Sequence, residues 1–184
     1  MKKIILTSAA FALLAFGMHS CKRGTSTLAI NSQELYYDLD SIPAKGWYSL
    51  TKIAKYDVDE FCAQNNIKKE WLQNMTFKDI QFDIVSGQLK FTDYDSIGVD
   101  VWVTGEDTVK IITKQVMDST TFTADKKSAT FKTDSTFNAL EYVSKGDVYM
   151  KVKLHAAHNH VPAGRVHATP HVDVLTELKR KLGL

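Results

Sequence analysis

Alternation of apolar and polar side chains with a period of two residues limits how this 184-residue chain can fold. The clearest example is segment 97–103, where Ile97, Val99, Val101 and Val103 occupy every second position. Segments 80–84 and 148–154 repeat the pattern. Because successive side chains of a strand point to opposite faces, each segment predicts a β-strand with one buried face.

Short turn sequences separate these segments, at Pro43–Gly46, Ser86–Gly87, Gly105–Asp107 and Pro162–Gly164. Roughly seven to nine short strands with such turns between them predict a mainly β, antiparallel sandwich or small barrel. The chain has no repeated βαβ spacing. With 44% hydrophobic residues, one core for one domain is expected.

Residues 57–75 interrupt the β pattern. Asp57 and Glu60 have the spacing of a helix-capping pair, and Val58, Phe61 and Cys62 follow helical spacing. We therefore expect a short helical insert over one open end of the sandwich, with Cys62 as a small core residue. The arrangement broadly resembles immunoglobulin-like or related sandwich domains of envelope lipoproteins, which implies a fold and no activity.

The first twenty residues have the composition of a secretory signal. Lys2 and Lys3 precede an apolar run from Ile4 to Phe16, and small residues follow it. The run is too short for a spanning helix, which needs about 20 apolar residues. We expect residues 1–20 to direct export and to be removed.

Ser20 and Cys21 end this signal in a way that resembles the lipobox of bacterial lipoproteins. The resemblance implies cleavage before Cys21 and acylation of that cysteine. Several acyl chains together hold a protein firmly at a bilayer. We expect residues 21–27 to be a lipidated tether, 28–175 the β-sandwich and 176–184 a basic C-terminal tail. Lys22 and Arg23 differ from the enteric retention signal, which favours the outer membrane; the periplasmic or surface orientation stays open.

The charge balance and the cysteine content limit the classes of partner and the covalent links that we expect. Once Lys2 and Lys3 are removed, 21 basic residues balance 21 acidic residues, so the mature domain lacks the basic footprint of a nucleic-acid-binding protein. Cys62 is then the only cysteine besides the acylated one, so no internal disulfide is expected. The expected partners are the membrane, through the lipid, and an envelope protein or glycan.

Histidines gather near the C-terminus. If the turn near Val161 joins the last two strands in a hairpin, His155 lies opposite His167. Converging imidazoles bind Zn²⁺ or Cu²⁺, so these residues are a candidate metal site, with exposed surface histidines as the alternative. The candidate ligands are His155, His158, His160, His167 and His171. Otherwise no cofactor is expected.

Trp102 is the candidate binding residue, because it alternates with the apolar positions of segment 97–103. It either packs beneath the helical insert, which we favour, or forms an exposed platform. The chain has no nucleophile elbow, phosphate loop or Cys-x-x-Cys motif, which favours a non-enzymatic protein. The leading hypothesis is a lipid-anchored binding or structural domain. A metal-binding lipoprotein and a hydrolase without a recognisable motif are the alternatives.

Overall fold

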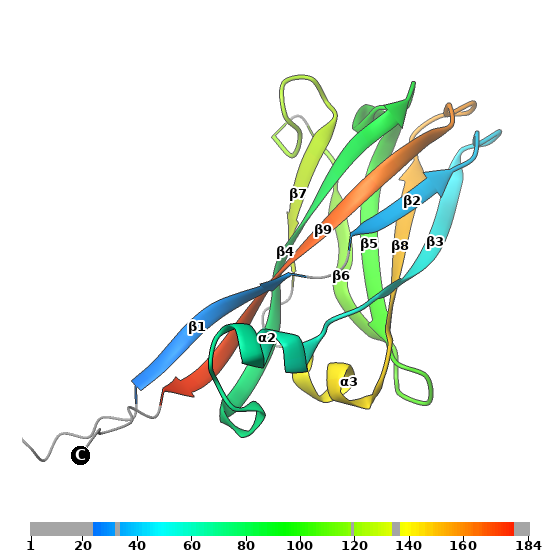
Figure 1. The fold of residues 1–184 in the computed structure, drawn as a ribbon. Coiled ribbons are helices and arrows are strands. Elements are labelled where there is room, and N and C mark those ends of the chain that lie inside the picture. The colour runs from blue at the N-terminus through cyan, green and yellow to red at the C-terminus, as the bar shows by residue number, and fades with distance from the viewer. Residues whose placement is uncertain (1–23, 32–33, 119, 134–136, 179–184) are drawn as a thin grey trace, which may run out of the picture.

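The computed structural model describes residues 24–31, 34–118, 120–133 and 137–178. Nine strands form two antiparallel sheets that pack face to face (Figure 1). Strands β1 (Gly24–Asn31), β2 (Leu35–Leu39), β4 (Leu72–Gly87), β7 (Ser128–Lys132) and β9 (Gly164–Leu178) form the five-stranded sheet. Strands β3 (Gly46–Ala54), β5 (Tyr94–Trp102), β6 (Val109–Val116) and β8 (Val148–Ala156) form the four-stranded sheet.

The strands pair in a nested order. β5 pairs with β6, β4 with β7, β3 with β8 and β2 with β9, so a long two-stranded ribbon is wrapped into two sheets. The resulting strand orders, β2-β9-β4-β7 and β3-β8-β5-β6, are those of a jelly roll. The predicted antiparallel β-sandwich is confirmed, and its connectivity is the jelly-roll type rather than the immunoglobulin type.

The expected hairpin between the last two strands is wrong. β8 and β9 lie in opposite sheets, and the loop between them crosses from one sheet to the other. The turn residues there permit a change of sheet as well as a hairpin, so local sequence does not decide between the two. By contrast, the hairpin predicted around Gly105 is present, since β5 and β6 pair antiparallel.

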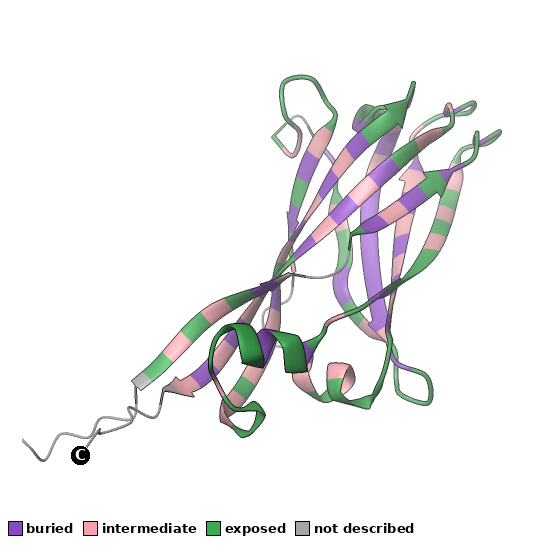
Figure 2. Cartoon of the chain, in the orientation of Figure 1, coloured by how far each residue is buried: buried purple, intermediate pink, exposed green. Residues whose placement is uncertain are grey.

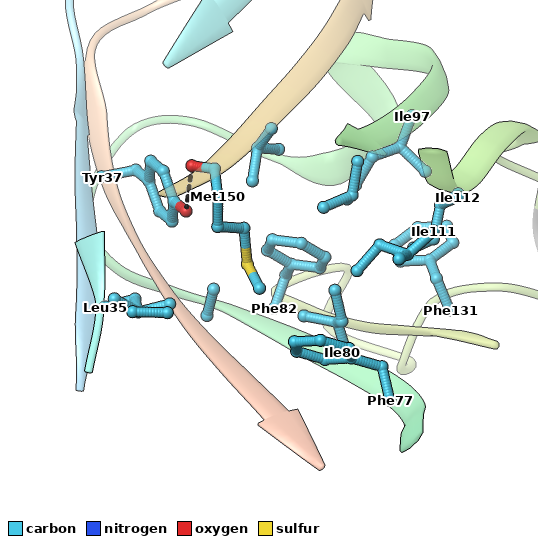
Figure 3. Packing of buried hydrophobic residues seen from close by; sticks show 14 of the residues in the cluster. Leu35, Tyr37, Phe77, Ile80, Phe82, Ile97, Ile111, Ile112, Phe131 and Met150 are labelled. Atoms are coloured by element: carbon cyan, nitrogen blue, oxygen red, sulfur yellow. Dashed lines mark hydrogen bonds between the residues drawn. The ribbon is translucent and has the colours of Figure 1, made fainter. Parts of the chain in front are cut away.

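Buried side chains fill the space between the sheets. Phe77, Ile80 and Phe82 of β4 are almost inaccessible, as are Val99 and Val101 of β5. The close view in Figure 3 shows these two sheets contributing rings and aliphatic chains to one cluster. Figure 2 shows the expected alternation of buried and more exposed residues along β9 and β2. The period-two pattern therefore has the predicted cause, which is burial of one face of each strand.

Two short helices lie at one end of the sandwich, α2 (Val58–Gln64) and α3 (Leu140–Lys145) (Figure 1). The Asp57 carboxylate accepts a hydrogen bond from the Glu60 backbone N–H at 2.8 Å, which confirms the predicted N-terminal cap. A 3-10 turn, η1 (Lys69–Trp71), follows, and β4 begins at Leu72. The helical insert therefore ends at residue 71, since pairing with β9 holds residues 72–75 in an extended strand. A second 3-10 turn, η2 (Phe91–Asp93), precedes β5.

β1 and the second half of β9 extend beyond the sandwich with β4 beside them (Figure 1). Gly24 pairs with Leu178, so the regular pairing includes residues 24–27 of the predicted tether and 176–178 of the predicted tail. The opposite end of the sandwich, which we call the distal end, carries the β2–β3, β4–β5, β6–β7 and β8–β9 loops. No helix in the described ranges is long and apolar enough to span a bilayer.

Candidate functional site

The five candidate histidines do not form one cluster. His155 belongs to the four-stranded sheet, whereas His167 and His171 lie on β9 in the five-stranded sheet. His158 and His160 are exposed in the loop that joins the two sheets. The proposed facing of His155 and His167 is therefore wrong, because it required β8 and β9 to pair with each other. In the described part of the chain, no three His, Cys, Asp or Glu side chains are placed to hold a metal ion.

Four of the five histidines contact individual neighbouring side chains instead. His155 Nδ1 lies 2.8 Å from Asp95, and His158 Nε2 lies 3.5 Å from Asp93. His171 pairs with Asp79, while His167 stacks on Tyr36 with ring centres 4.7 Å apart. The His167–Tyr36 and His171–Asp79 contacts join cross-strand neighbours of the five-stranded sheet, whereas the His158–Asp93 contact joins two segments outside the strands.

The two cysteines fall in different places. Cys21 lies outside the described residues, so its predicted acylation stays a prediction. Cys62 is buried on α2, as expected of a core residue, and burial raises the pKa of its thiol. A buried thiol with a raised pKa is a poor nucleophile.

The outer face of the four-stranded sheet carries the most unusual surface. Cross-strand neighbours share a face, and the register places Trp47 beside His155, Thr51 beside Lys151, and Ile53 beside Tyr149. β5 adds Ser96, Gly98, Asp100 and Trp102 to the same face. We call this surface the lysine–tryptophan face; its residues are Trp47, Ser49, Thr51, Ile53, Ser96, Gly98, Asp100, Trp102, Lys110, Lys114, Tyr149, Lys151, Lys153 and His155.

Trp47 marks the distal end of this face. Its side chain is 51% exposed, an unusual position for the largest apolar residue. The ring of His155 lies 5.1 Å from it, and the ammonium of Lys114 lies 6.0 Å from its centre. Since β8 and β5 separate β3 from β6, Trp47 and Lys114 reach toward each other across two strands.

Trp102 repeats this arrangement at the other end of the face. It stacks on Tyr149 with ring centres 5.4 Å apart, and the Lys151 ammonium lies 5.4 Å from its ring centre. Trp102 is partly exposed, and the cover that the structure shows comes from these two β8 residues. It therefore belongs to an outward platform on the sheet, which was the less favoured of the two expectations.

The lysines on this face differ in their partners. Lys153 Nζ lies 2.8 Å from an oxygen of Asp100, and both side chains are largely buried. Within the described segments, no carboxylate forms an ion pair with Lys110, Lys114 or Lys151. The named residues of this face include four lysines and one carboxylate, Asp100, so the face presents net positive charge beside aromatic rings.

Asp95 lies near the distal end, where it contacts Ser96 and His155 of the lysine–tryptophan face. Its Oδ1 accepts a hydrogen bond from the Ser96 hydroxyl at 3.0 Å and contacts His155 Nδ1 at 2.8 Å. Burial would raise the pKa of Asp95, but the contacts with Ser96 and His155 outweigh it and hold that pKa below its usual range. Ser96 donates its hydroxyl hydrogen to Asp95, and no hydrogen bond joins Ser96 to the His155 imidazole among the described residues, although a catalytic serine needs that contact for its activation.

A cavity of about 400 Å³ opens beside Asp95 at the distal end. Tyr94, Met117 and Phe122 supply apolar lining, and Asp118 and Lys126 add charged groups. The Tyr94 hydroxyl is buried and has no hydrogen-bond partner among the described residues. Burial also raises the pKa of Tyr94 well above its ordinary value, so the hydroxyl stays protonated.

Sequence reasoning identified Trp102 but not the surface around it. Trp47 and His155 are far apart in the chain, and only the β3–β8 register makes them neighbours. A usable signal was present in the sequence, because Trp47 shares its parity in the predicted strand 47–53 with Ser49 and Thr51, which are typical of a solvent-facing side, and the structure shows all three exposed. An exposed strand face that contains tryptophan indicates a binding surface more directly than a group of histidines does.

Comparisons with known proteins supply no identity. No family model matches the chain, and no curated protein matches its sequence. The chain is weakly similar to the Turnip Yellow Mosaic Virus structure, with 6% identity, coverage of 86% of this chain and 98% of that one, and a TM-score of 0.32. The 60-mer BFDV capsid protein is 9% identical, with coverage of 88% of this chain and 98% of that one and a TM-score of 0.30. A structure of accessory secretory proteins 1, 2 and 3 of Streptococcus pneumoniae is 14% identical, with coverage of 89% of this chain and 90% of that one and a TM-score of 0.25. TM-scores this low do not support a fold assignment, so the jelly-roll assignment depends on the strand order alone.

Proposed function

We propose that this protein is a lipid-anchored, non-enzymatic binding protein of a bacterial cell envelope, held at the outer membrane through acylated Cys21. The support for the anchor is the charged start, the apolar run and the Ser20–Cys21 ending of the signal. The described chain begins at the end of the molecule opposite the distal loops (Figure 1). A lipid attached just before β1 would leave the sandwich and its distal end accessible.

The lysine–tryptophan face is the binding surface in this proposal. One observation carries it: the half-exposed Trp47 has Lys114 over its ring and His155 beside it. An indole left in water on a strand loses the burial energy that it would gain in the core, which is about 25 cal/mol per Å² of apolar surface. Aromatic residues in such positions commonly supply contact area for a partner.

A non-enzymatic role is supported by the chemistry of the polar groups near this face. The Asp95 carboxylate contacts both the Ser96 hydroxyl and the His155 imidazole. Ser96 therefore donates to a carboxylate and not to an imidazole, which does not activate the serine. The sequence has no catalytic motif to set against this geometry. The proposal therefore assigns the surface to recognition.

Two experiments test the proposal. For the anchor, intact-mass spectrometry of the protein from membranes should find cleavage before Cys21 and added acyl mass, and Cys21→Ala should abolish incorporation of an alkyne fatty acid. An unmodified Cys21 on a protein released into the medium would overturn the anchor.

For the surface, a photo-crosslinking amino acid is placed at Ser49 or Thr51 in the full chain in cells. Thr130, exposed on β7 of the opposite sheet, is the matched control position. We expect crosslinked adducts from Ser49 and Thr51 but not from Thr130. Equal adducts from all three positions, or adducts from Thr130 alone, would show that another surface is used.

A further inference from the structure

We propose that the ligand of the lysine–tryptophan face is an extended acidic glycan, which lies along β8 and contacts both tryptophans. This inference rests on the proposed function and names the chemical class that the same surface takes. It depends on three properties of the face: its length, its uncompensated charge and its flat aromatic groups.

The first property is the distance between the two Trp–Lys pairs. Trp47 is level with His155 and Trp102 is level with Tyr149, so six residues of β8 separate them. At about 3.3 Å per residue, the pairs are roughly 20 Å apart. A single small molecule does not reach both pairs, whereas an extended polymer does.

The second property is charge. In the described part of the chain, Lys110, Lys114 and Lys151 have no ion-paired carboxylate, and the Lys153–Asp100 pair between the two ends neutralises itself. Asp95 is already in contact with Ser96 and His155. A ligand with carboxylate or sulfate groups would supply the missing counter-charges, and attraction to it would weaken with added salt.

The third property is the aromatic surface. Trp47 is half exposed with Lys114 over its ring, and Trp102 and Tyr149 form a stacked pair with ring centres 5.4 Å apart. The apolar C–H surface of a sugar ring can pack on such planes while its polar groups reach the lysines around them. A purely ionic ligand would use the lysines and gain nothing from the tryptophans.

Single-stranded nucleic acid is also an extended polyanion with stacking groups. The glycan is favoured because the export signal directs the chain to the envelope and because the mature chain has no net positive charge. Nucleic acid is therefore an outcome of the test rather than a second proposal.

The test measures binding of the full-length lipidated protein, in detergent micelles, to three probes of matched length. These are polygalacturonate, neutral dextran and a thymidine oligonucleotide. We expect polygalacturonate to bind and dextran not to bind, with affinity falling as sodium chloride rises from 50 to 200 mM. Lys114→Ala and Lys151→Ala should each weaken binding about tenfold. Lys132→Ala on the opposite sheet is the control and should leave binding unchanged.

Trp47→Phe and Trp47→Ala complete the set, because the phenylalanine variant keeps a ring for stacking and the alanine variant does not. We expect phenylalanine to retain most of the affinity. Equal or tighter binding of the oligonucleotide, or binding unaffected by the Lys114 and Lys151 variants, would overturn the glycan assignment. If crosslinks still form at Ser49 while polygalacturonate does not bind, the binding face stands and only the ligand class is wrong.

Discussion

Each of the two sheets has an outer face that contacts solvent, and the side chains on the two outer faces differ in their chemistry. On the five-stranded sheet, polar side chains satisfy one another: Asp79 pairs with His171, and Asp83 accepts hydrogen bonds from Ser128 and Gln81. On the four-stranded sheet, Trp47 is half exposed, and Lys114 and Lys151 have aromatic neighbours but no ion-paired carboxylate among the residues that the structure describes.

The difference separates what folding requires from what it does not. A strand's outer face needs only polar groups that are solvated or paired, and the five-stranded sheet meets that need with short local contacts. Exposed tryptophan and uncompensated lysine add nothing to that requirement. Their concentration on one face is the reason to assign binding to that face.

The largest effect on stability is expected at the Asp100–Lys153 pair. Asp100→Ala would leave a largely buried lysine without its partner, so we expect the free energy of unfolding in urea to fall by about 2 kcal/mol. The matched change on the other face, Asp79→Ala, breaks a more exposed pair and should cost less than about 1 kcal/mol. Equal losses would mean that the two faces do not differ in this respect.

A second pair of variants separates stability from binding. Tyr36 stacks on His167 and has the Arg165 guanidinium 4.6 Å from its ring centre, so Tyr36→Ala should lower the free energy of unfolding by about 1 kcal/mol. Trp47→Ala, at a half-exposed site, should change it by less than about 0.5 kcal/mol.

Binding of polygalacturonate should show the reverse order, with Trp47→Ala losing affinity and Tyr36→Ala keeping it. Both variants are measured by urea denaturation and by the same binding assay. A Trp47→Ala protein that unfolds readily but binds normally would make Trp47 a structural residue.

Local features of this fold were predictable from the sequence. The alternation of Ile80, Phe82 and Ile84 gave the buried side of β4, because inward orientation depends only on position along a strand. The Asp57–Glu60 spacing gave the start of α2, because a helix cap is formed by residues three apart. Each of these contacts is set by neighbours in the chain.

Pairing between strands was not predictable in the same way. The sequence around Pro162–Gly164 suits a turn, but whether the chain pairs with the preceding strand or crosses to the other sheet depends on partners far away. In the nested order of this fold, β8 pairs with β3 and β9 with β2. The candidate histidine cluster failed for that reason, and the Trp47–His155 contact stayed hidden for the same reason.

A third comparison uses two buried tyrosines, one from each sheet. The Tyr37 hydroxyl of β2 donates a hydrogen bond to the Met150 carbonyl at 3.3 Å, whereas the Tyr94 hydroxyl of β5 has no partner within the described ranges. Tyr37→Phe should therefore lower the free energy of unfolding by about 1 kcal/mol, and Tyr94→Phe should leave it unchanged or raise it slightly. Urea denaturation of both proteins measures this. A loss of the same size in Tyr94→Phe would mean that its hydroxyl finds a partner in solution.

The smallest expected effect is the loss of stability at acidic pH when Asp95 is protonated. Because the folded-state pKa of Asp95 is held below its usual range, its ionised form stabilises the folded protein above the unfolded-state value of about 3.9. That contribution is lost as the pH falls through the lower folded-state pKa. The carboxylate is well exposed, so water screens the interaction and the change in stability should be small.

The pKa itself gives the sharper measurement. Carbon NMR of the Asp95 carboxyl should give a titration midpoint below the ordinary value, and Ser96→Ala should move it upward by removing a donor to Oδ1. His155→Ala should do the same by removing the second contact. If neither change moves the midpoint, Asp95 is not held by these residues. It would then count as a free carboxylate on the lysine–tryptophan side of the molecule, and the contrast in charge between the two faces would be smaller than the structure indicates.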